Sequence, residues 1–350
     1  MEKENFLIYG AYGYTGELIS RLAVEKGHRP TLAGRDENKT KQLAAELQLP
    51  YVAFDLNDQA AVEAAIRPFK AVLHCAGPFA LTARPKIKAC LNTQTHYLDI
   101  TGEIEVFEYA ASKDKAAKAA NIVVLPGVGF DVVPSDCLAS FLKQALPSAT
   151  HLELAFAGLG GLSQGTALTM ARNAHRGGAI RKEGKIKVVP AAYEVREIDY
   201  GPKQYTSVTI PWGDVSTAYY RTQIPNIKVF TAQPKKAIRM LKLSNYFGWL
   251  IKTDFVQNYL KKKIKGGQRG PNEDTRKTFK SYLWGKASNN KKTVEARLIT
   301  PEGYALTATT ALMATERVLQ GEYQVGFQTP SLAFGADFIL EVEGTERTLV

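Results

Sequence analysis

The sequence has few cysteines, no long apolar run and no internal repeat. Its three cysteines, Cys75, Cys90 and Cys137, are an odd number without the spacing of a metal site, so neither a disulfide framework nor a bound metal is predicted. This cysteine usage favours a reducing compartment. The apolar stretch Phe247–Ile251 is far shorter than the ~20 residues that span a bilayer.

At the start of the sequence no basic segment precedes an apolar one, so a secretory signal is not expected. We therefore expect a cytoplasmic or peripheral protein. Basic residues outnumber acidic ones, and the net charge is +11. Such a charge favours a phosphorylated cofactor, an acidic substrate or a membrane surface, although a solvated basic face is the simpler explanation. Nucleic acid is not an expected partner, because no recognisable binding module surrounds the charge.

Short apolar runs alternate with amphipathic segments over the first 130 residues. The apolar runs predict strands at 6–9, 30–33, 51–54, 71–74, 97–100 and 122–125. Helices are predicted at 15–25, 39–47, 60–66, 86–91 and 106–120. This alternation predicts an α/β fold, a doubly wound parallel sheet of Rossmann type, over residues 1–135.

The alternation ends after Asp136. A helix predicted at 137–145 is followed by strands at 151–157, 193–198, 205–210, 228–231 and 293–299, which indicates a second, α+β domain over residues 136–300. Residues 261–292 are rich in Lys, Gly, Asn and Arg and predict an exposed basic insertion. Residues 301–350 include an Ala/Thr/Leu-rich helix at 304–319, and we expect this C-terminal segment to pack back on the Rossmann domain.

The strongest functional signal is a glycine-rich turn between the first predicted strand and the first helix. Its residues are Gly10, Ala11, Tyr12, Gly13, Tyr14, Thr15 and Gly16. Gly10 permits the tight turn, Gly13 lets the backbone approach a pyrophosphate, and Gly16 lets the helix pack closely on the strand. The helix N-terminus supplies N–H groups and a partial positive charge for phosphate. We therefore predict that these seven residues bind a dinucleotide; the alternative is an ordinary glycine-rich turn.

The end of the second strand distinguishes NADP from NAD. NAD sites usually place an acidic residue there to bind the ribose hydroxyls. Here the strand ends Ala33-Gly34-Arg35-Asp36. Because Arg35 can make a bidentate, charge-assisted contact with a 2′-phosphate, NADP is the predicted cofactor. NAD remains possible through Asp36, and a solvated loop arginine is the alternative for Arg35.

Two further segments complete the predicted cofactor site. Asp55 ends the third strand, where its side chain either reaches the adenine amino group or caps the next helix. Ala76, Gly77 and Pro78 follow the fourth strand at the carboxyl edge, where ligands bind in such folds. We expect this loop to lie against the nicotinamide ribose. Cys75 is predicted to be a small buried residue rather than a nucleophile.

Polar side chains follow the fifth and sixth strands. Tyr97 and Asp99 end the fifth strand, and Asp131 follows the sixth. A carboxylate at this edge can act as a general acid or base, and Tyr97 can polarise the site, so these three are the predicted catalytic residues. A helix cap or a hinge hydrogen bond is the alternative for Asp99 and Asp131, as it is for Glu103.

Several motifs together resemble the saccharopine dehydrogenase-like oxidoreductases. In the first domain they are the glycine-rich turn, Ala33-Gly34-Arg35, 75–79, 97–103 and 129–136. In the second domain and beyond they are 163–167, 211–214, 224–227, 284–285, 300–304 and 329–335. The match is closer to the trans-acting enoyl reductase and vertebrate branch, because true saccharopine reductases usually carry a G-x-G-x-V-G turn. The resemblance implies an NAD(P)-binding Rossmann domain, a second α/β domain and reduction of C=C or C=N, but it brings no secure catalytic residue.

These observations predict an NADPH-dependent oxidoreductase that transfers hydride to an activated C=C of a lipid-like or acyl substrate. The alternative is reduction of an imine, C=N, between an amino acid and an oxoacid. That reaction requires arginines that grip carboxylates, for which Arg172, Arg176 and Arg221 are available. A homodimer is suggested by family analogy alone.

A hypothesis of another class is a membrane- or lipid-associated protein that binds NADP with little catalysis. Its support is the segment Leu243–Leu260, which sets aromatic residues close to the lysines at 261–263. Aromatic and basic residues together suit an anionic interface. An apolar helix packed in the core, with a solvated basic tail, is the simpler explanation.

Overall fold

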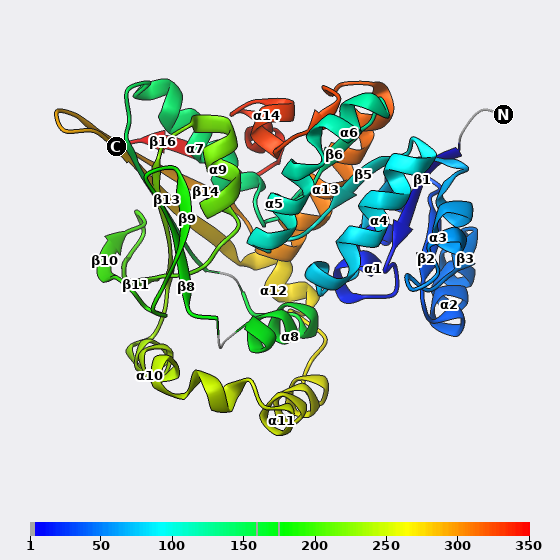
Figure 1. Cartoon of the computed structure of the whole chain (residues 1–350), viewed down its shortest axis with the longest axis horizontal. Coiled ribbons are helices and arrows are strands. Elements are labelled where there is room, and N and C mark those ends of the chain that lie inside the picture. The colour runs from blue at the N-terminus through cyan, green and yellow to red at the C-terminus, as the bar shows by residue number, and fades with distance from the viewer. Residues whose placement is uncertain (1–3, 159, 174–175) are drawn as a thin grey trace. The chain divides into compact units, whose positions relative to one another are not determined.

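The computed structural model describes residues 4–158, 160–173 and 176–350. The chain forms two compact units (Figure 1). Unit 1 comprises Met1–Val133 and Tyr304–Phe334, and unit 2 comprises Pro134–Gly303 and Gly335–Val350. The sequence predicts that all of residues 301–350 pack on the Rossmann domain, but in the structure only Tyr304–Phe334 belong to unit 1 and Gly335–Val350 belong to unit 2. Residues 346–349 pair with a strand of unit 2, which draws the last residues into that unit.

Unit 1 is built on a seven-stranded parallel sheet with the order β15-β6-β5-β4-β1-β2-β3. The strands are β1 (Glu4–Tyr9), β2 (Thr31–Gly34), β3 (Tyr51–Ala53), β4 (Phe69–His74), β5 (His96–Asp99), β6 (Val123–Leu125) and β15 (Gly326–Phe327). The predicted Rossmann fold is confirmed. The strand order reverses between β1 and β4, and ligands bind at such a switch point, beyond the carboxyl ends of the strands.

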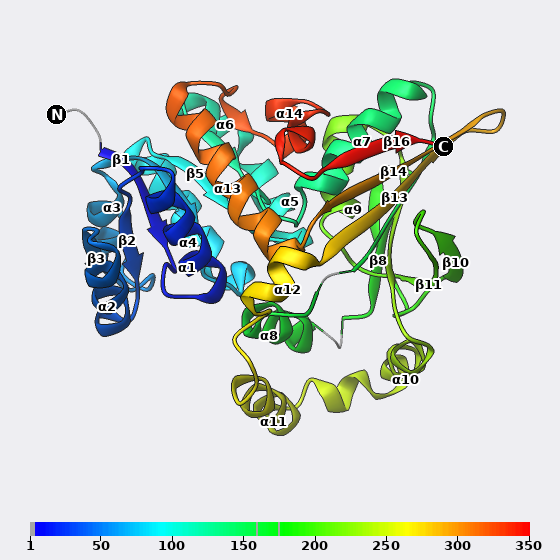
Figure 2. The same ribbon diagram turned by 180° about the vertical axis from the view of Figure 1, so that it is seen from behind.

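Helices cover both faces of this sheet. They are α1 (Tyr14–Glu25), α2 (Glu37–Leu47), α3 (Gln59–Ile66), α4 (Phe79–Thr93), α5 (Ile104–Ser112), α6 (Asp114–Ala119), α13 (Gly303–Gln320) and α14 (Pro330–Phe334). Figure 1 shows α4 and α5 in front of the sheet, and Figure 2 shows α1 and α13 in front of it. In α1 the buried residues recur at helical spacing, at Gly16, Ile19, Ser20 and Ala23.

Unit 2 contains a nine-stranded mixed sheet, so the predicted second α+β domain is confirmed. Its strands are β7 (His151–Ala157), β8 (Gly178–Lys182), β9 (Lys185–Val189), β10 (Val195–Asp199), β11 (Gln204–Thr209), β12 (Asn226–Ala232), β13 (Lys280–Ser288), β14 (Thr293–Pro301) and β16 (Glu346–Leu349). Its helices are α7 (Val133–Ala145), α8 (Gln164–Asn173), α9 (Asp214–Thr222), α10 (Lys235–Ile251), α11 (Asp254–Lys265) and α12 (Glu273–Thr278). Strands β12 and β7 pair in parallel, and the other strand pairs among the described residues of this sheet are antiparallel.

The predicted basic insertion at 261–292 is wrong for its last third. Residues 280–288 form β13, an inner strand that pairs with both β7 and β14. Ser281, Leu283, Gly285 and Ala287 alternate along one face of β13 and are buried. A Cβ on Gly285 would lie 2.6 Å from the Leu142 side chain, so glycine permits the close packing of α7. The many lysines of residues 261–292 indicate an exposed segment, and they made the strand-like alternation of small and apolar residues at 281–287 hard to recognise.

Across the described ranges, no helix is both long and apolar enough to cross a bilayer.

Candidate functional site

The glycine-rich turn connects β1 to α1 and has room only for glycine at two of its positions. Gly10 has a φ of +85°, and a Cβ there would lie 2.8 Å from the backbone nitrogen of Ala76. A Cβ on Gly16 would overlap the carbonyl oxygen of Gly10. The turn is closed by the Gly13 N–H, which donates to the Gly10 carbonyl at 3.0 Å. The three glycines therefore fold the backbone tightly between strand and helix.

The N-terminus of α1 has no side-chain cap. Gly13 is the N-cap residue, and its backbone is extended with φ −68° and ψ 160°. The first N–H groups of a helix lack partners within the helix, and together with the helix dipole they favour an anion. Beside this end, the rings of Tyr14 and Tyr304 meet edge to face with centroids 5.1 Å apart. The first turn of α1 thus has the properties of a phosphate site.

Arg35, which follows β2, is available to bind an anion, whereas the neighbouring Asp36 is already bonded to Lys39. Arg35 is exposed, and within the described residues it forms no ion pair. Asp36 caps α2, because its carboxylate accepts from the Lys39 backbone N–H at 3.1 Å and lies 3.2 Å from the Lys39 ammonium. The backbone hydrogen bond from Lys39 lowers the pKa of Asp36. Tyr12 lies over Gly34, where a Cβ would overlap its ring.

Asp55 lies just after β3 and is exposed. Its carboxylate accepts from the Asn57 N–H at 2.8 Å, which forms a local turn. The cap of α3 is instead Asp58, which accepts from the Ala61 N–H at 3.1 Å. The helix-cap alternative that the sequence left open for Asp55 therefore belongs to Asp58.

The loop Ala76–Pro78 is held beside the glycine-rich turn. Ala76 lies against Gly10, and its carbonyl accepts from the Thr82 hydroxyl at 2.7 Å. The Gly77–Pro78 peptide bond is cis. Glu103 caps α4, since its carboxylate accepts from the backbone N–H groups of residues 79 and 80 at 2.7 and 3.2 Å. This cap explains why α4 begins at residue 79 rather than at the predicted residue 86.

Tyr97 and Asp99 are fully buried and bonded to each other. The Tyr97 hydroxyl donates to Asp99 at 2.6 Å, and the other carboxylate oxygen accepts from the N–H groups of Thr101 and Gly127, both at 3.0 Å. Burial raises the pKa of Asp99 to about 6. The pair joins β5 to the loop that follows β6. Its hydrogen bonds suit a positioning role better than direct contact with a substrate.

Asp131 has a different environment. It lies against Gly102, where a Cβ would overlap its carboxylate. Among the described residues, no hydrogen bond reaches this carboxylate, and burial raises its pKa to about 7. Of the three predicted catalytic residues, Asp131 is the one whose carboxyl group is suited to hold a transferable proton near neutral pH.

The sequence reasoning missed a buried lysine beneath this edge of the sheet. Lys86 is fully buried on α4, and its ammonium nitrogen lies 3.2 Å from the centroid of the Tyr9 ring. His74, at the end of β4, is bonded to the Thr82 hydroxyl at 2.9 Å. Desolvation lowers the pKa of both Lys86 and His74, whereas it raises that of the Cys75 thiol. The available signal was the spacing of Ala83, Lys86, Ile87 and Cys90 on one helix face.

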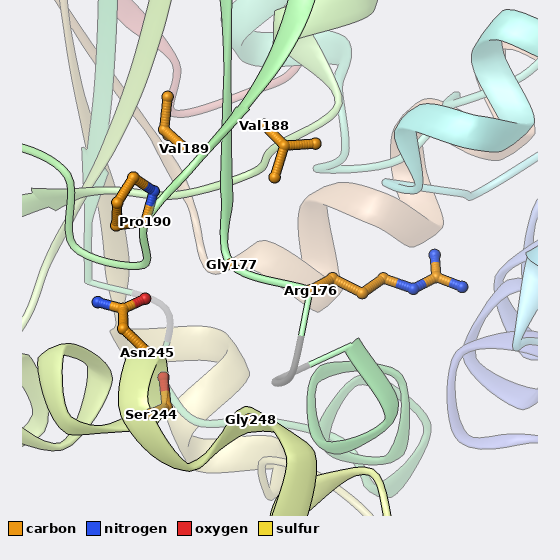
Figure 3. Close-up of a pocket in the computed structure, with 8 residues that line it drawn as sticks. All are labelled: Arg176, Gly177, Val188, Val189, Pro190, Ser244, Asn245 and Gly248. Atoms are coloured by element: carbon orange, nitrogen blue, oxygen red, sulfur yellow. The ribbon is translucent and has the colours of Figure 1, made fainter.

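Unit 2 contains a pocket of about 340 Å³ between the β8–β9 region and α10 (Figure 3). Of the three arginines proposed to grip carboxylates, Arg176 lines it, and its guanidinium extends away from Asn245. Arg221 donates to the Ser140 hydroxyl at 2.8 Å, and Arg172 lies on α8. The described parts of unit 2 thus do not gather the three arginines in this pocket.

Comparisons with known proteins identify unit 1. Residues 6–125 match the family model described as "Saccharopine dehydrogenase NADP binding domain". This segment is therefore similar in sequence to that NADP-binding domain. It contains the glycine-rich turn, Arg35, the 76–78 loop and the Tyr97–Asp99 pair.

Relatives of the saccharopine dehydrogenase type match a part of this chain. A saccharopine dehydrogenase-like oxidoreductase of Mus musculus is 28% identical over 38% of this chain and 35% of its own length. A trans-acting enoyl reductase of Mycobacterium leprae is 32% identical over 38% of this chain and 34% of its own length. The matched part of the chain thus spans about a third of the length of each relative.

A solved structure extends the likeness of the fold to both units. The saccharopine dehydrogenase (L-Glu forming) of Saccharomyces cerevisiae superposes with a TM-score of 0.67 at 13% identity, covering 99% of this chain and 100% of the yeast chain. At this identity the likeness concerns the fold.

Proposed function

We propose that this protein is an NADP(H)-dependent oxidoreductase that reduces an activated C=C bond in an acyl, lipid-like substrate. The preference for NADP over NAD rests on the two residues that follow β2. There Arg35 is exposed and without an ion pair among the described residues, whereas Asp36 is bonded to Lys39. A guanidinium in this position suits the 2′-phosphate, and an acid already used as a helix cap is a poor partner for the ribose.

Different residues of unit 1 bind different parts of the dinucleotide. The first turn of α1 holds the diphosphate, Arg35 holds the 2′-phosphate, and Asp55 lies where the adenine is expected. Ala76, Gly77 and Pro78 flank the nicotinamide ribose beyond β4. When bound, the cofactor supplies hydride, which the side chains of this chain cannot supply.

Asp131 supplies the proton in this proposal. Reduction of an enoyl group needs hydride at one carbon and a proton at the next, so that the double bond becomes a single bond. The Asp131 carboxyl, with its pKa raised to about 7 by burial, is protonated in part of the population at neutral pH. Tyr97 and Asp99 position the loops around it through their hydrogen bonds.

One observation favours C=C over C=N reduction. The relative named trans-acting enoyl reductase is 32% identical to this chain over 142 residues. The proposal therefore ranks an enoyl substrate first.

The test measures NADPH oxidation with two probes, an α,β-unsaturated acyl thioester and a mixture of an α-oxo acid with an amino acid. We expect turnover of the thioester, which Asp131→Asn lowers by ~10²–10⁴-fold while NADPH affinity is retained. Turnover of the oxo acid mixture alone would replace the proposed substrate class. Equal activity of Asp131→Asn and the wild type would refute the role of Asp131.

A further inference from the structure

Helix α10 exposes an unusual amount of apolar surface. Seven large apolar side chains on α10 and α11 are between 51% exposed, at Phe247, and 83% exposed, at Phe255. We call this set the aromatic face, and its members are Met240, Leu243, Tyr246, Phe247, Trp249, Phe255 and Tyr259. Single exposed apolar residues are common, but such a concentration of them on two successive helices is typical of an interaction surface.

Other residues of α10 dock this helix firmly on unit 2. Ile238 is buried in a cluster with Ala192 and Val208, and the Asn245 amide bonds both the N–H and the carbonyl of Ala191, at 2.7 and 3.1 Å. The exposure of the aromatic face is therefore not the result of a helix that lacks packing. The expectation that this segment is an apolar helix packed in the core is wrong for its outer side.

Positive charge surrounds the aromatic face. The segment 235–265 contains eight lysines and one arginine against a single acid, Asp254, which gives +8 of the net charge of +11. Lys242 and Lys252 are exposed on the same stretch, and Lys261–Lys263 follow on α11. In the part of the chain that the structure describes, none of these cations forms an ion pair with a carboxylate. The charge is thus available to a partner.

We propose that the aromatic face and its lysines dock this protein on an anionic lipid membrane. Aromatic side chains enter the boundary between headgroups and acyl chains, while lysines beside them bind lipid phosphates and carboxylates. Figures 1 and 2 both show α10 and α11 at the end of unit 2 opposite α7 and β16. Two such faces would repel each other through their like charges, which disfavours a second copy of the chain as the occupant.

The experiment measures co-sedimentation with phosphatidylcholine vesicles that contain or lack phosphatidylserine, at increasing salt. We expect binding to the phosphatidylserine vesicles that weakens as salt increases, and little binding to neutral ones. Trp249 reports the contact directly, since its emission should shift to shorter wavelength on binding and the shift should disappear in Trp249→Phe. Absence of binding to either vesicle overturns the proposal, as does binding that is equal for both.

Matched charge-reversal variants distinguish binding through the aromatic face from a general effect of net charge. Lys261→Glu/Lys262→Glu should weaken binding on the order of tenfold or more. Lys291→Glu/Lys292→Glu makes the same change of net charge in the β13–β14 turn and should weaken binding far less. Equal losses in both variants contradict a specific face. Concentration-dependent dimerisation that Trp249→Ala abolishes, without vesicle binding, would assign the face to a second copy instead. NADPH titration of each variant confirms that unit 1 is intact.

Discussion

Gly10 and Gly27 form a matched pair that tests the steric argument for the dinucleotide turn. Their φ angles are almost the same, +85° and +84°, and both favour glycine. Their surroundings differ. A Cβ on Gly10 would lie 2.8 Å from the backbone nitrogen of Ala76, whereas a Cβ on Gly27 would have nothing within 4 Å. Replacing each glycine with alanine therefore adds the same backbone strain but creates a steric clash at one site only.

The expected magnitudes follow from this difference. A residue with a side chain at positive φ costs about 1–2 kcal/mol, so Gly27→Ala should lower the free energy of unfolding by about that amount. Gly10→Ala adds an overpacking cost of about 1–3 kcal/mol, because the neighbouring atoms belong to the backbone and cannot rotate away. The displaced Ala76 loop should also weaken NADPH binding by roughly tenfold or more, about 1.4 kcal/mol. Gly27→Ala should leave that affinity unchanged.

Urea unfolding and calorimetric NADPH titration of the two variants measure both quantities. The reasoning fails if the two alanine variants lose equal stability. It also fails if Gly10→Ala binds NADPH as tightly as the wild type, because the turn would then tolerate a side chain beside the proposed diphosphate.

Three further predictions concern named acids. Burial raises the pKa of Asp131 to about 7, so the carboxyl group is protonated below that pH and NADPH oxidation should fall above it. A pH profile of kcat checks this, and Asp131→Asn should remove the pH dependence. Tyr97→Phe removes a hydrogen-bond donor to Asp99, whose pKa is raised to about 6. Because the lost bond is stronger when the Asp99 carboxyl is ionised, the variant should lose about 1.5–3 kcal/mol of unfolding free energy above pH 6 and less below it. Equal losses at pH 5 and pH 8 would contradict this. Asp36→Ala removes the cap of α2 and should lower the free energy of unfolding measurably, and Asp36→Asn much less, with NADPH affinity unchanged in the asparagine variant; a large affinity loss there would place Asp36 on the ribose.

Local sequence patterns were sufficient to predict the Rossmann unit, because its signals lie within short segments. Phe6–Tyr9 is an apolar run, Gly10–Gly16 follows it at once, and an amphipathic helix comes next. The start of α4 depends instead on Glu103, which lies on another element and caps residues 79 and 80. No pattern around Pro85 indicates such a distant cap.

The arrangement at the carboxyl edge could be predicted only in part. The sequence placed Tyr97, Asp99 and Asp131 at this edge, but not the hydrogen bonds that occupy Asp99 or the packing of Asp131 on Gly102. The spacing of Lys86 with Ala83, Ile87 and Cys90 on one helix face indicates its burial, but lysine is rarely buried fully, so residue type argues against it. The hydrogen bonds of Asp99 and the packing of Asp131 arise from tertiary contacts that local sequence patterns do not reveal.

The most direct test of the central claim is a titration of the purified protein with NADPH and with NADH, repeated for Arg35→Ala. The account predicts tighter binding of NADPH by the wild type and a loss of roughly 10- to 150-fold in Arg35→Ala, as expected for a charged hydrogen bond, with NADH affinity unchanged. Equal losses for both nucleotides, or no binding of either one by the folded wild type, would contradict it.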